Sequence, residues 1–293
     1  MVKIGVVGIS GRWSSEEMTA AVEKKTGFRL LVEMDRVRYE SRRETLFYKG
    51  VDLGTLDGLI VKKIGARFSP DHLQRLEMLR YLRARGVRVF SDPAAIARCL
   101  DRLSCTLTLR LGGIPMPEIV LTEHIEAAEA AVRRFGQAVF KPLFTSKARG
   151  MEVMRSDDPE LRESIGAFRE QGNCLLYVQK KIDLPGRDLG IAFLRGRYVG
   201  AYARVAPAGS WNTTTVNGGR YEAAKPSRDI VELASRAAAL FGLDFTCVDV
   251  VEGHEGPMVF EGSALGGFRG LWEAQGINMA EMIVDSVLEA VHE

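Results

Sequence analysis

Residues 249–263, which read DVVEGHEGPMVFEGS, hold two short apolar runs on either side of a turn rich in glycine and proline. This pattern is typical of a β-hairpin. With the turn centred at position 255, Val251 opposes Val259 and Asp249 opposes Glu261. Directly opposed side chains point to the same face of a sheet, with Cβ atoms about 5 Å apart. The hairpin therefore predicts two carboxylates side by side.

Two like charges this close on a half-buried sheet repel each other and raise the pKa of one carboxyl group. A cation between them removes the repulsion. Oxygen ligands favour Mg²⁺, which commonly takes one or two carboxylates together with substrate phosphates. The alternative is a pair of ordinary acids on an edge strand that faces solvent. The spacing of Asp249 and Glu261 alone leaves both interpretations open.

The composition is that of a soluble globular protein. The 293 residues suffice for one large domain or two smaller ones, and the net charge of +2 argues neither for nor against nucleic acid. No apolar run reaches membrane-spanning length, and the opening MVKIGVVGIS reads as a first strand rather than a signal peptide. The cysteines are scattered, which predicts reduced core thiols in a cytoplasmic protein. They are Cys99, Cys105, Cys174 and Cys247.

Strand and helix patterns alternate over residues 1–95, which predicts an α/β unit with a parallel sheet and helices on its faces. We expect Ser14 and Glu17 to form a capping box and Ser69 to cap the second helix. The expected strands cover 3–9, 28–34, 57–64 and 87–92, and the expected helices 11–27 and 69–86.

Residues 96–293 form the second predicted domain. A capped helix from Asp92 to about Leu111 spans the start of this domain. A small α+β unit at about 112–181 follows, and strand hairpins with two further helices complete a second sheet. We therefore expect a chain of mixed α/β and α+β class.

Six stretches from about residue 98 onward resemble the ATP-grasp superfamily, and specifically its RimK-like carboxylate–amine ligases. In family order they are DRLSCTLTLRLGGIPMPEIVLT, VFKPLFTSKARGMEV, LLYVQKKI, GRDLGIAFLRGRYVGAYARV, WNTTTVNGG and CVDVVEGHEGPMVFEGSALGGFRGLWEAQGINMAEMIV. The opening KIGVVGISGRWSSEEMTAAVEKKTGFRLLVEMDRVRYE also resembles a bacterial subgroup, the GAK-system ATP-grasp proteins.

The resemblance implies an ATP-grasp fold in which residues 1–95 are the pre-ATP-grasp domain and 112–181 are a mobile lid over ATP. Such ligases activate a carboxylate with ATP and Mg²⁺ (or Mn²⁺) as an acyl phosphate, which an amine then attacks. The implied substrates are small-molecule or peptide carboxylates and amines, with glutamate or another amino acid as a candidate. We expect a homo-oligomer, a dimer or tetramer, without nucleic-acid or membrane partners.

Lys141 matches the family lysine that contacts the ATP phosphates, and an ammonium group is a suitable point charge for phosphate oxygens. The loop TSKARG occupies the place of the family's flexible phosphate-covering loop. It is poorer in glycine and serine than usual, and it adds Lys147 and Arg149. These cations suit phosphate or an acidic substrate. The alternatives are a lysine at a strand edge and an ordinary solvated loop.

The stretch VQKKI matches the hinge strand whose backbone bonds the adenine edge. This implies contacts from Gln179, Lys181 and Ile182. Family members commonly have glutamate where Lys180 stands, so a side-chain acceptor for the adenine amino group is missing here. Asp188 matches the acid that binds the ribose hydroxyls.

Asp249 and Glu261 match the family's metal carboxylates, and the third ligand, usually asparagine, is replaced by Ser263. A serine hydroxyl is a weaker ligand on a shorter stem, and water can replace it. In close relatives an Arg-x-Asn pattern lies near the phosphates. Asn212 and Thr214 stand in those positions here and can donate hydrogen bonds but carry no charge.

Two arginines are candidate catalytic residues. Arg204 matches a basic residue on the strand floor, and Arg269 is a candidate clamp for a substrate carboxylate, with an exposed loop arginine as the alternative. The preceding Gly266–Gly267 gives a phosphate close access to backbone N–H groups. Arg12 and Trp13 follow the first strand, at the edge where open α/β sheets bind ligands, although Trp13 is equally a packing residue.

The leading hypothesis is an ATP-dependent carboxylate–amine ligase. The first alternative is an ATP-binding switch in a partner system with little ligase turnover, which the changes at Lys180 and Ser263 favour. The second alternative is an ATP-grasp kinase that forms no amide bond. Against the switch, Lys141, Asp249 and Glu261 are all present, and phosphoryl transfer depends mainly on positioning and charge neutralisation.

Overall fold

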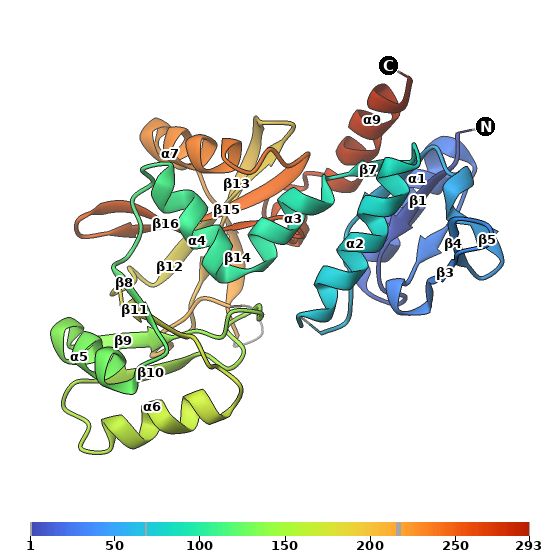
Figure 1. Cartoon of the computed structure of the whole chain (residues 1–293). Coiled ribbons are helices and arrows are strands. Elements are labelled where there is room, and N and C mark those ends of the chain that lie inside the picture. The colour runs from blue at the N-terminus through green and yellow to red at the C-terminus, as the bar shows by residue number, and fades with distance from the viewer. Residues whose placement is uncertain (1, 68, 215–217, 293) are drawn as a thin grey trace.

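A computed structural model of the chain describes residues 2–67, 69–214 and 218–292 (Figure 1). The N-terminal sheet is parallel, with strand order β2-β1-β6-β7, as the sequence predicts. Its strands are β1 (Ile4–Val7), β2 (Leu31–Val32), β6 (Gly58–Val61) and β7 (Arg88–Phe90). Helices α1 (Trp13–Thr26) and α2 (Asp71–Ala84) connect them. The expected strand at 28–34 is reduced to two residues.

A small antiparallel sheet between β2 and β6 was not predicted. It consists of β3 (Arg38–Glu40), β4 (Thr45–Tyr48) and β5 (Val51–Asp52), flanked by short 3₁₀ turns at Met34–Arg36 and Leu53–Thr55. All four residues of β4 are buried, but β3 is charged and mostly exposed. The sequence therefore lacks the alternation that marks a strand pair.

The predicted helix caps are wrong by one or two residues. Helix α1 begins at Trp13, so Ser14 lies inside its first turn, and Glu16 rather than Glu17 accepts the Gly11 N–H, at 2.9 Å. Helix α2 begins at Asp71, and the Ser69 hydroxyl bonds the Asp71 carboxylate instead of a helix N–H. The predicted end of the first helix at residue 27 is confirmed, because Gly27 is in the left-handed conformation after α1.

The helix expected from Asp92 to Leu111 is two helices, α3 (Pro93–Leu100) and α4 (Arg102–Leu111). Asp101 between them is extended, and its carboxylate accepts the N–H groups of Leu103 and Ser104 at 3.1 and 3.2 Å. An aspartate that satisfies two free N–H groups is a good N-cap, which favours a new helix start there. The break places Arg102 at the beginning of α4.

Residues 119–180 carry an antiparallel sheet of strand order β10-β9-β11-β8 with its own apolar cluster. Its strands are β8 (Ile119–Thr122), β9 (Gln137–Phe140), β10 (Glu152–Arg155) and β11 (Leu176–Lys180), and its helices are α5 (Ile125–Phe135) and α6 (Leu161–Glu170). In Figure 1 this unit stands apart below the rest of the molecule. We refer to it as the lid. The domain boundaries inferred from the sequence stay predictions.

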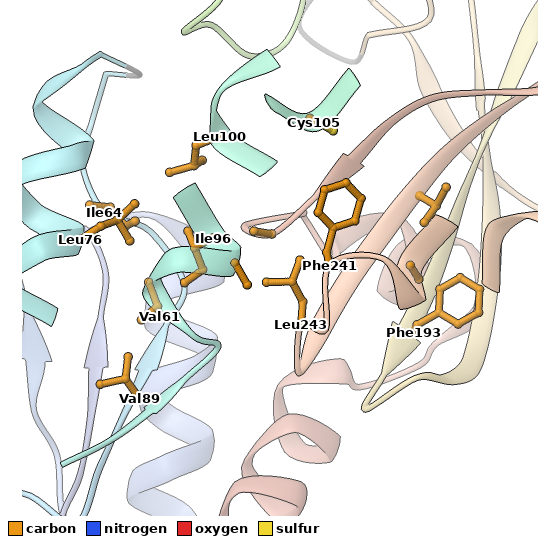
Figure 2. Close-up of a cluster of buried hydrophobic side chains, with 14 of the residues drawn as sticks. Val61, Ile64, Leu76, Val89, Ile96, Leu100, Cys105, Phe193, Phe241 and Leu243 are labelled. Carbon is orange, nitrogen blue, oxygen red and sulfur yellow. The ribbon is translucent and has the colours of Figure 1, made fainter. Parts of the chain in front are cut away.

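The largest sheet is antiparallel, with strand order β14-β13-β12-β15-β16, and we call it the floor sheet. Its strands are β12 (Arg187–Leu194), β13 (Arg197–Val205), β14 (Arg220–Ala223), β15 (Phe245–Gly253) and β16 (Gly256–Ser263), and helix α7 (Arg228–Ala239) packs against it. Figure 2 shows Ile96 and Leu100 of α3 near Phe241 and Leu243, so α3 joins this core to that of the N-terminal sheet.

The chain ends with α8 (Arg269–Gln275) and α9 (Met279–His292), and α9 returns to pack on α1. Lys24 and Lys25 of α1 pair with Glu281 and Asp285 of α9, at 2.8 and 2.5 Å. No helix among the described residues is long and apolar enough to span a membrane.

All four cysteines are free, as predicted. Cys105 and Cys247 are buried and Cys99 is half-buried. Cys174 is exposed shortly before β11, so the prediction of four core thiols is wrong there.

Candidate active site

The 249–263 hairpin forms as β15 and β16, and Asp249 does oppose Glu261. The register near the turn differs from the prediction, because Val251 opposes Met258 rather than Val259. The turn contains only two residues between Gly253 and Gly256, which moves the register by one. A bulge between the two halves of the ladder then moves it back. The predicted carboxylate pair therefore arises from two features that compensate.

Arg204 supplies the positive charge beside Asp249. It projects from β13 opposite Asp188 of β12, forms a two-point ion pair with Asp188, and lies 2.9 Å from the Asp249 carboxylate. Burial raises the pKa of Asp249 to about 7, and Glu261 and Asp188 add to the rise while Arg204 opposes it. The predicted residues Arg204, Asp188 and Asp249 thus form one charged group on three adjacent strands.

Glu261 has a different cation, Arg102, whose guanidinium lies 3.0 Å from its carboxylate. Arg102 is buried, and it also donates to the carbonyl oxygens of Pro142 and Thr145, at 3.0 and 3.3 Å. One side chain therefore joins α4, the loop after β9 and the end of β16. Sequence reasoning missed Arg102, and the only available signal was its position directly after the capping Asp101.

Lys141, directly after β9, lies beside Gln179 of β11, the neighbouring strand of the lid. The Lys141 ammonium donates to Gln179 Oε1 at 2.7 Å and lies 5.4 Å from the centre of the Phe260 ring on β16. Burial and the nearby charge of Arg102 lower the pKa of Lys141 to about 7, while Glu261 opposes the change. A phosphate bound here would favour the protonated ammonium group.

The other predicted adenine contacts lie on the chain that leaves β11. The Lys181 N–H already donates to Gln137 O at 3.0 Å, and the Lys181 ammonium pairs with Asp183 at 3.0 Å. Ile182 lies near the hairpin turn, because a Cβ added to Gly253 would be 3.8 Å from its side chain. The segment therefore links the lid to the turn of the hairpin.

Ser263 opposes Cys247 on the same face as Asp249 and Glu261. The following loop folds back over it, since a Cβ on Gly266 would lie 3.4 Å from the Ser263 Cβ atom. No group of three His, Cys, Asp or Glu side chains with metal-binding spacing occurs among the residues that the structure describes. The two opposed carboxylates nevertheless fit Mg²⁺, which accepts a few carboxylates and completes its shell with water and phosphate oxygens.

Lys62, directly after β6 of the N-terminal sheet, contacts the loop that contains Gly266. Its buried ammonium group donates to Gly266 O at 2.6 Å and lies 5.0 Å from the centre of the Phe268 ring. Burial, with a contribution from the charge of Lys63, lowers the pKa of Lys62 to about 7. No pattern along the chain indicates this contact, which joins residues 204 positions apart.

Arg269 is the first residue of α8 and not a loop residue. It pairs with Glu273 at 2.5 Å, and its guanidinium lies 5.6 Å from the centre of the Trp13 ring. Trp13 also packs against Phe268 and Trp272, with ring centroids 5.4 and 6.4 Å apart. The recorded side-chain partners of Arg269 in the described structure are thus Glu273 and Trp13, rather than the hairpin acids.

Asn212 and Thr214 contact each other: Asn212 Oδ1 accepts the Thr214 N–H at 3.2 Å and its hydroxyl at 2.8 Å. The remainder of the predicted segment includes residues 215–217, which lie outside the described residues.

Comparison with known proteins identifies the family. The family model of the RimK-like ATP-grasp domain matches residues 99–287. A tetrahydromethanopterin:α-L-glutamate ligase of Methanosarcina acetivorans is 30% identical over 97% of this chain and 98% of its own. A probable α-L-glutamate ligase of Nitrosococcus oceani is 24% identical over 98% of this chain and 95% of its own.

Solved structures share the fold at lower identity. The ATP-grasp ligase PsnB, complexed with a minimal precursor, superposes with a TM-score of 0.75 at 18% identity, covering 98% of this chain and 99% of PsnB. D-alanyl-alanine synthetase A from Vibrio cholerae gives 0.74 at 16% identity, covering 100% and 99%. The chain therefore belongs to the RimK-like ATP-grasp family of carboxylate–amine ligases.

Proposed function

We propose that this ligase joins a substrate carboxylate to the amino group of L-glutamate, with ATP, Mg²⁺ and an acyl-phosphate intermediate. The observation that carries the proposal is the carboxylate pair Asp249 and Glu261, surrounded by cations from three parts of the chain. Arg204 comes from the floor sheet, Arg102 from α4 and Lys141 from the lid. Several relatives are named as α-L-glutamate ligases, which supports glutamate as the amine.

In the first step an oxygen of the substrate carboxylate attacks the γ-phosphorus of ATP, and the bond to the bridging oxygen breaks to release ADP. The charge that develops on the phosphate oxygens needs fixed positive partners. Lys141 supplies one from the lid, and Mg²⁺ held by Asp249 and Glu261 would supply further neutralisation. Arg204 and Arg102 hold the two carboxylates in place when no nucleotide is bound.

In the second step the amine lone pair attacks the acyl carbon, the phosphate leaves, and the nitrogen loses a proton as the amide forms. We place the acyl phosphate beside the loop that contains Gly266 and Gly267. A Cβ on Gly267 would meet no atom within 4 Å, so ligand can approach the backbone there. The Lys62 ammonium group holds the Gly266 carbonyl oxygen at 2.6 Å, which fixes the position of this loop.

The test is trapping of the intermediate. With ATP, Mg²⁺ and a panel of carboxylic acids, hydroxylamine should convert the acyl phosphate to a hydroxamate, and ADP should appear in step with it. Lys141→Ala should abolish both signals. AMP and pyrophosphate as products would reject the acyl-phosphate route. Tight ATP binding with no ADP above background, for every acid tested, would favour the ATP-binding switch instead.

A second measurement addresses glutamate. Once an acid that gives hydroxamate is known, L-glutamate should compete with hydroxylamine and yield an amide product, detected by mass spectrometry. L-glutamine, which has the same shape without the side-chain charge, is the control. Equal competition by glutamine would contradict glutamate as the preferred amine.

A further inference from the structure

A buried lysine of the N-terminal sheet reaches into the loop that follows the hairpin. Lys62 is only 2% exposed, and its backbone N–H donates to Val7 O at 2.9 Å, which fixes the residue at the carboxyl edge of the sheet, between β1 and β6. Its side-chain nitrogen lies 2.6 Å from Gly266 O and 3.4 Å from Leu265 O. One donor group from the N-terminal sheet therefore contacts two successive carbonyl groups of the loop.

Packing alone does not account for a lysine at this position. Burial of an amine has a cost that an apolar side chain avoids. Lys62 pairs with no carboxylate in the described part of the chain, and its other close contact is the Phe268 ring, 5.0 Å away. A methionine fills a similar volume without this cost. What the lysine adds is direction, because a hydrogen bond restricts the orientation of its acceptor and an apolar contact does not.

The orientation of a carbonyl group determines that of the next N–H group along the chain. The atoms of a peptide unit lie in one plane, and in the trans form the C=O and N–H bonds point in opposite directions. The bond between Gly266 and Gly267 is trans, so the Gly267 N–H points away from the Lys62 side chain. The longer contact of Lys62 with Leu265 O turns the Gly266 N–H in the same way.

The loop is tightly packed at one glycine and open at the next. A Cβ on Gly266 would lie 3.1 Å from the Cys247 Cβ atom, so the loop sits directly on β15. Gly267 is exposed, and a Cβ there would meet no atom within 4 Å. Within the described residues, neither the Gly266 N–H nor the Gly267 N–H has a hydrogen-bond acceptor. The loop thus offers two backbone donors that the protein itself does not use.

These donors lie next to the carboxylate pair. The loop folds back over Ser263, since a Cβ on Gly266 would be 3.4 Å from the Ser263 Cβ atom. Ser263 is two residues after Glu261 on the same strand and on the same face. Two residues of a strand span about 7 Å. An acyl phosphate bound beside Glu261 can therefore accept hydrogen bonds from the loop.

We propose that Lys62 is a positioning residue of the ligase: it holds the loop so that the N–H groups of Gly266 and Gly267 point toward the acyl phosphate. This inference rests on the proposed function. Because Lys62 is buried, it acts through the loop and does not touch the substrate. Donors that are already oriented stabilise the charge on the transferred group without reorganisation during the reaction. The N-terminal sheet thus takes part in phosphate recognition through one side chain.

The test observes the loop donors directly, with inorganic phosphate as the probe. The full chain is labelled with ¹⁵N-glycine, and the Gly267 amide signal is assigned from its loss in Gly267→Ala, which the open space there tolerates. Phosphate is titrated into the Mg²⁺–ADP complex, with chloride at equal ionic strength as the reference. The test variant is Lys62→Met. The control is Lys63→Met, which removes the adjacent, half-buried lysine, whose N–H also donates to Val7 O.

In the wild type, phosphate should move the Gly267 amide proton downfield, because the N–H gains an anionic acceptor. In Lys62→Met this shift should be lost and phosphate affinity should fall about tenfold, while Mg²⁺–ADP affinity is unchanged. Lys63→Met should keep the shift. A full Gly267 response in Lys62→Met would overturn the proposal. An equal loss in Lys63→Met would also overturn it, because charge and not orientation would then be the cause.

Thermal unfolding of each protein shows whether the variants are folded. If Lys62→Met does not fold, Lys62→Gln takes its place, because glutamine keeps a donor on a shorter stem. Its Gly267 response to phosphate should be weaker than that of the wild type, and a full response would contradict the proposal. The wild type is itself a test, since a Gly267 signal that does not respond to phosphate would overturn the proposal without any variant.

This outcome is separate from that of the trapping experiment. The phosphate titration requires no turnover, so a Gly267 response that depends on Lys62 stands even if no acid yields ADP. Where an acid does yield hydroxamate, Lys62→Met should lower kcat about tenfold and leave the KM for ATP unchanged, a split that a loss of stability does not produce. Hydroxamate formation at the wild-type kcat in Lys62→Met would leave the ligase proposal intact and reject the positioning role.

Discussion

The two acids of the hairpin face each other across one ladder, yet different regions of the molecule hold them. Asp249 is buried and paired with Arg204, its neighbour in the same sheet. The Glu261 side chain is 41% exposed and pairs with Arg102, which reaches it from α4 and also contacts the loop at the base of the lid. Asp249 is therefore held within the floor sheet, whereas the position of Glu261 depends on the positions of α4 and the lid.

This difference has a consequence for ligand binding. A metal–nucleotide complex that takes Asp249 as a ligand meets a carboxylate whose position is already fixed by two strands. The same complex must share Glu261 with Arg102. Because Arg102 also donates to the carbonyl oxygens of Pro142 and Thr145, a change at Glu261 affects the loop at the base of the lid. We infer that nucleotide binding is sensed by the lid on the Glu261 side of the hairpin.

The largest expected effect on stability comes from removing Arg204, the cation that pairs with Asp249. Arg204→Met leaves Asp188 and Asp249 buried without their cation, which should lower the free energy of unfolding by about 3–5 kcal/mol. Urea denaturation measures this. The control, Arg187→Met, removes an exposed partner of Glu252 in the same sheet and should cost at most about 1 kcal/mol. Equal losses in the two variants would show that the Asp249 side is not specially held.

A smaller effect concerns the loop beyond Glu261, which Lys62 anchors. The pKa of Lys62 is about 7 in the folded chain and 10.5 in the unfolded chain. At pH values between these two, unfolding takes up a proton, so raising the pH makes unfolding less favourable. From pH 7 to 9 this lysine should add about 2 kcal/mol of stability.

The measurement compares the wild type with Lys62→Met over that pH range. The variant should gain about 2 kcal/mol less between pH 7 and 9 than the wild type does. Lys24→Met is the control, because its pairing with Glu281 raises the Lys24 pKa and keeps the group charged throughout. Parallel pH profiles for the wild type and Lys62→Met would mean that Lys62 remains charged in the folded chain.

The smallest effect on stability is expected from changing Arg102, the cation that pairs with Glu261. Arg102→Lys keeps the charge but loses the fork that reaches Glu261 and the two carbonyl oxygens, at a cost of about 1 kcal/mol. Hydrogen exchange should become faster in 142–151. Arg110→Lys, on the same helix, loses bonds to the carbonyls of Met116 and Pro117 and should leave that exchange unchanged. No acceleration in Arg102→Lys would remove the proposed link to the lid.

The parts of the site that lie on regular strands could be predicted from the sequence. The opposed pair Asp249 and Glu261 follows from the apolar runs around one turn. Family motifs point to Asp188 and Arg204 on strands and to Lys141 directly after a strand. Even there, the two-residue turn and the bulge had to compensate for the opposed pair to form. Patterns along the chain report the face of a strand but not an irregularity within it.

Contacts between distant segments could not be predicted. Arg102 meets Glu261 across 159 positions and Lys62 meets Gly266 across 204, so neither leaves a local pattern. The sheet of β3 to β5 was missed because the charges of β3 hide its alternation. The break at Asp101 was missed because the apolar pattern continues through it, although an aspartate followed by two free N–H groups is a recognisable cap.

The most direct test of the central claim is calorimetry of Mg²⁺–ATP binding to Glu261→Gln, with Glu252→Gln as the control on the same hairpin. Glutamine keeps the shape of the side chain and removes the charge that a metal ion requires, so the first variant should bind Mg²⁺–ATP about tenfold more weakly or worse, while its thermal stability is retained. Glu252 pairs with Arg187 near the turn, and its variant should bind as the wild type does. Unchanged affinity in Glu261→Gln would contradict a metal–nucleotide site on the hairpin face.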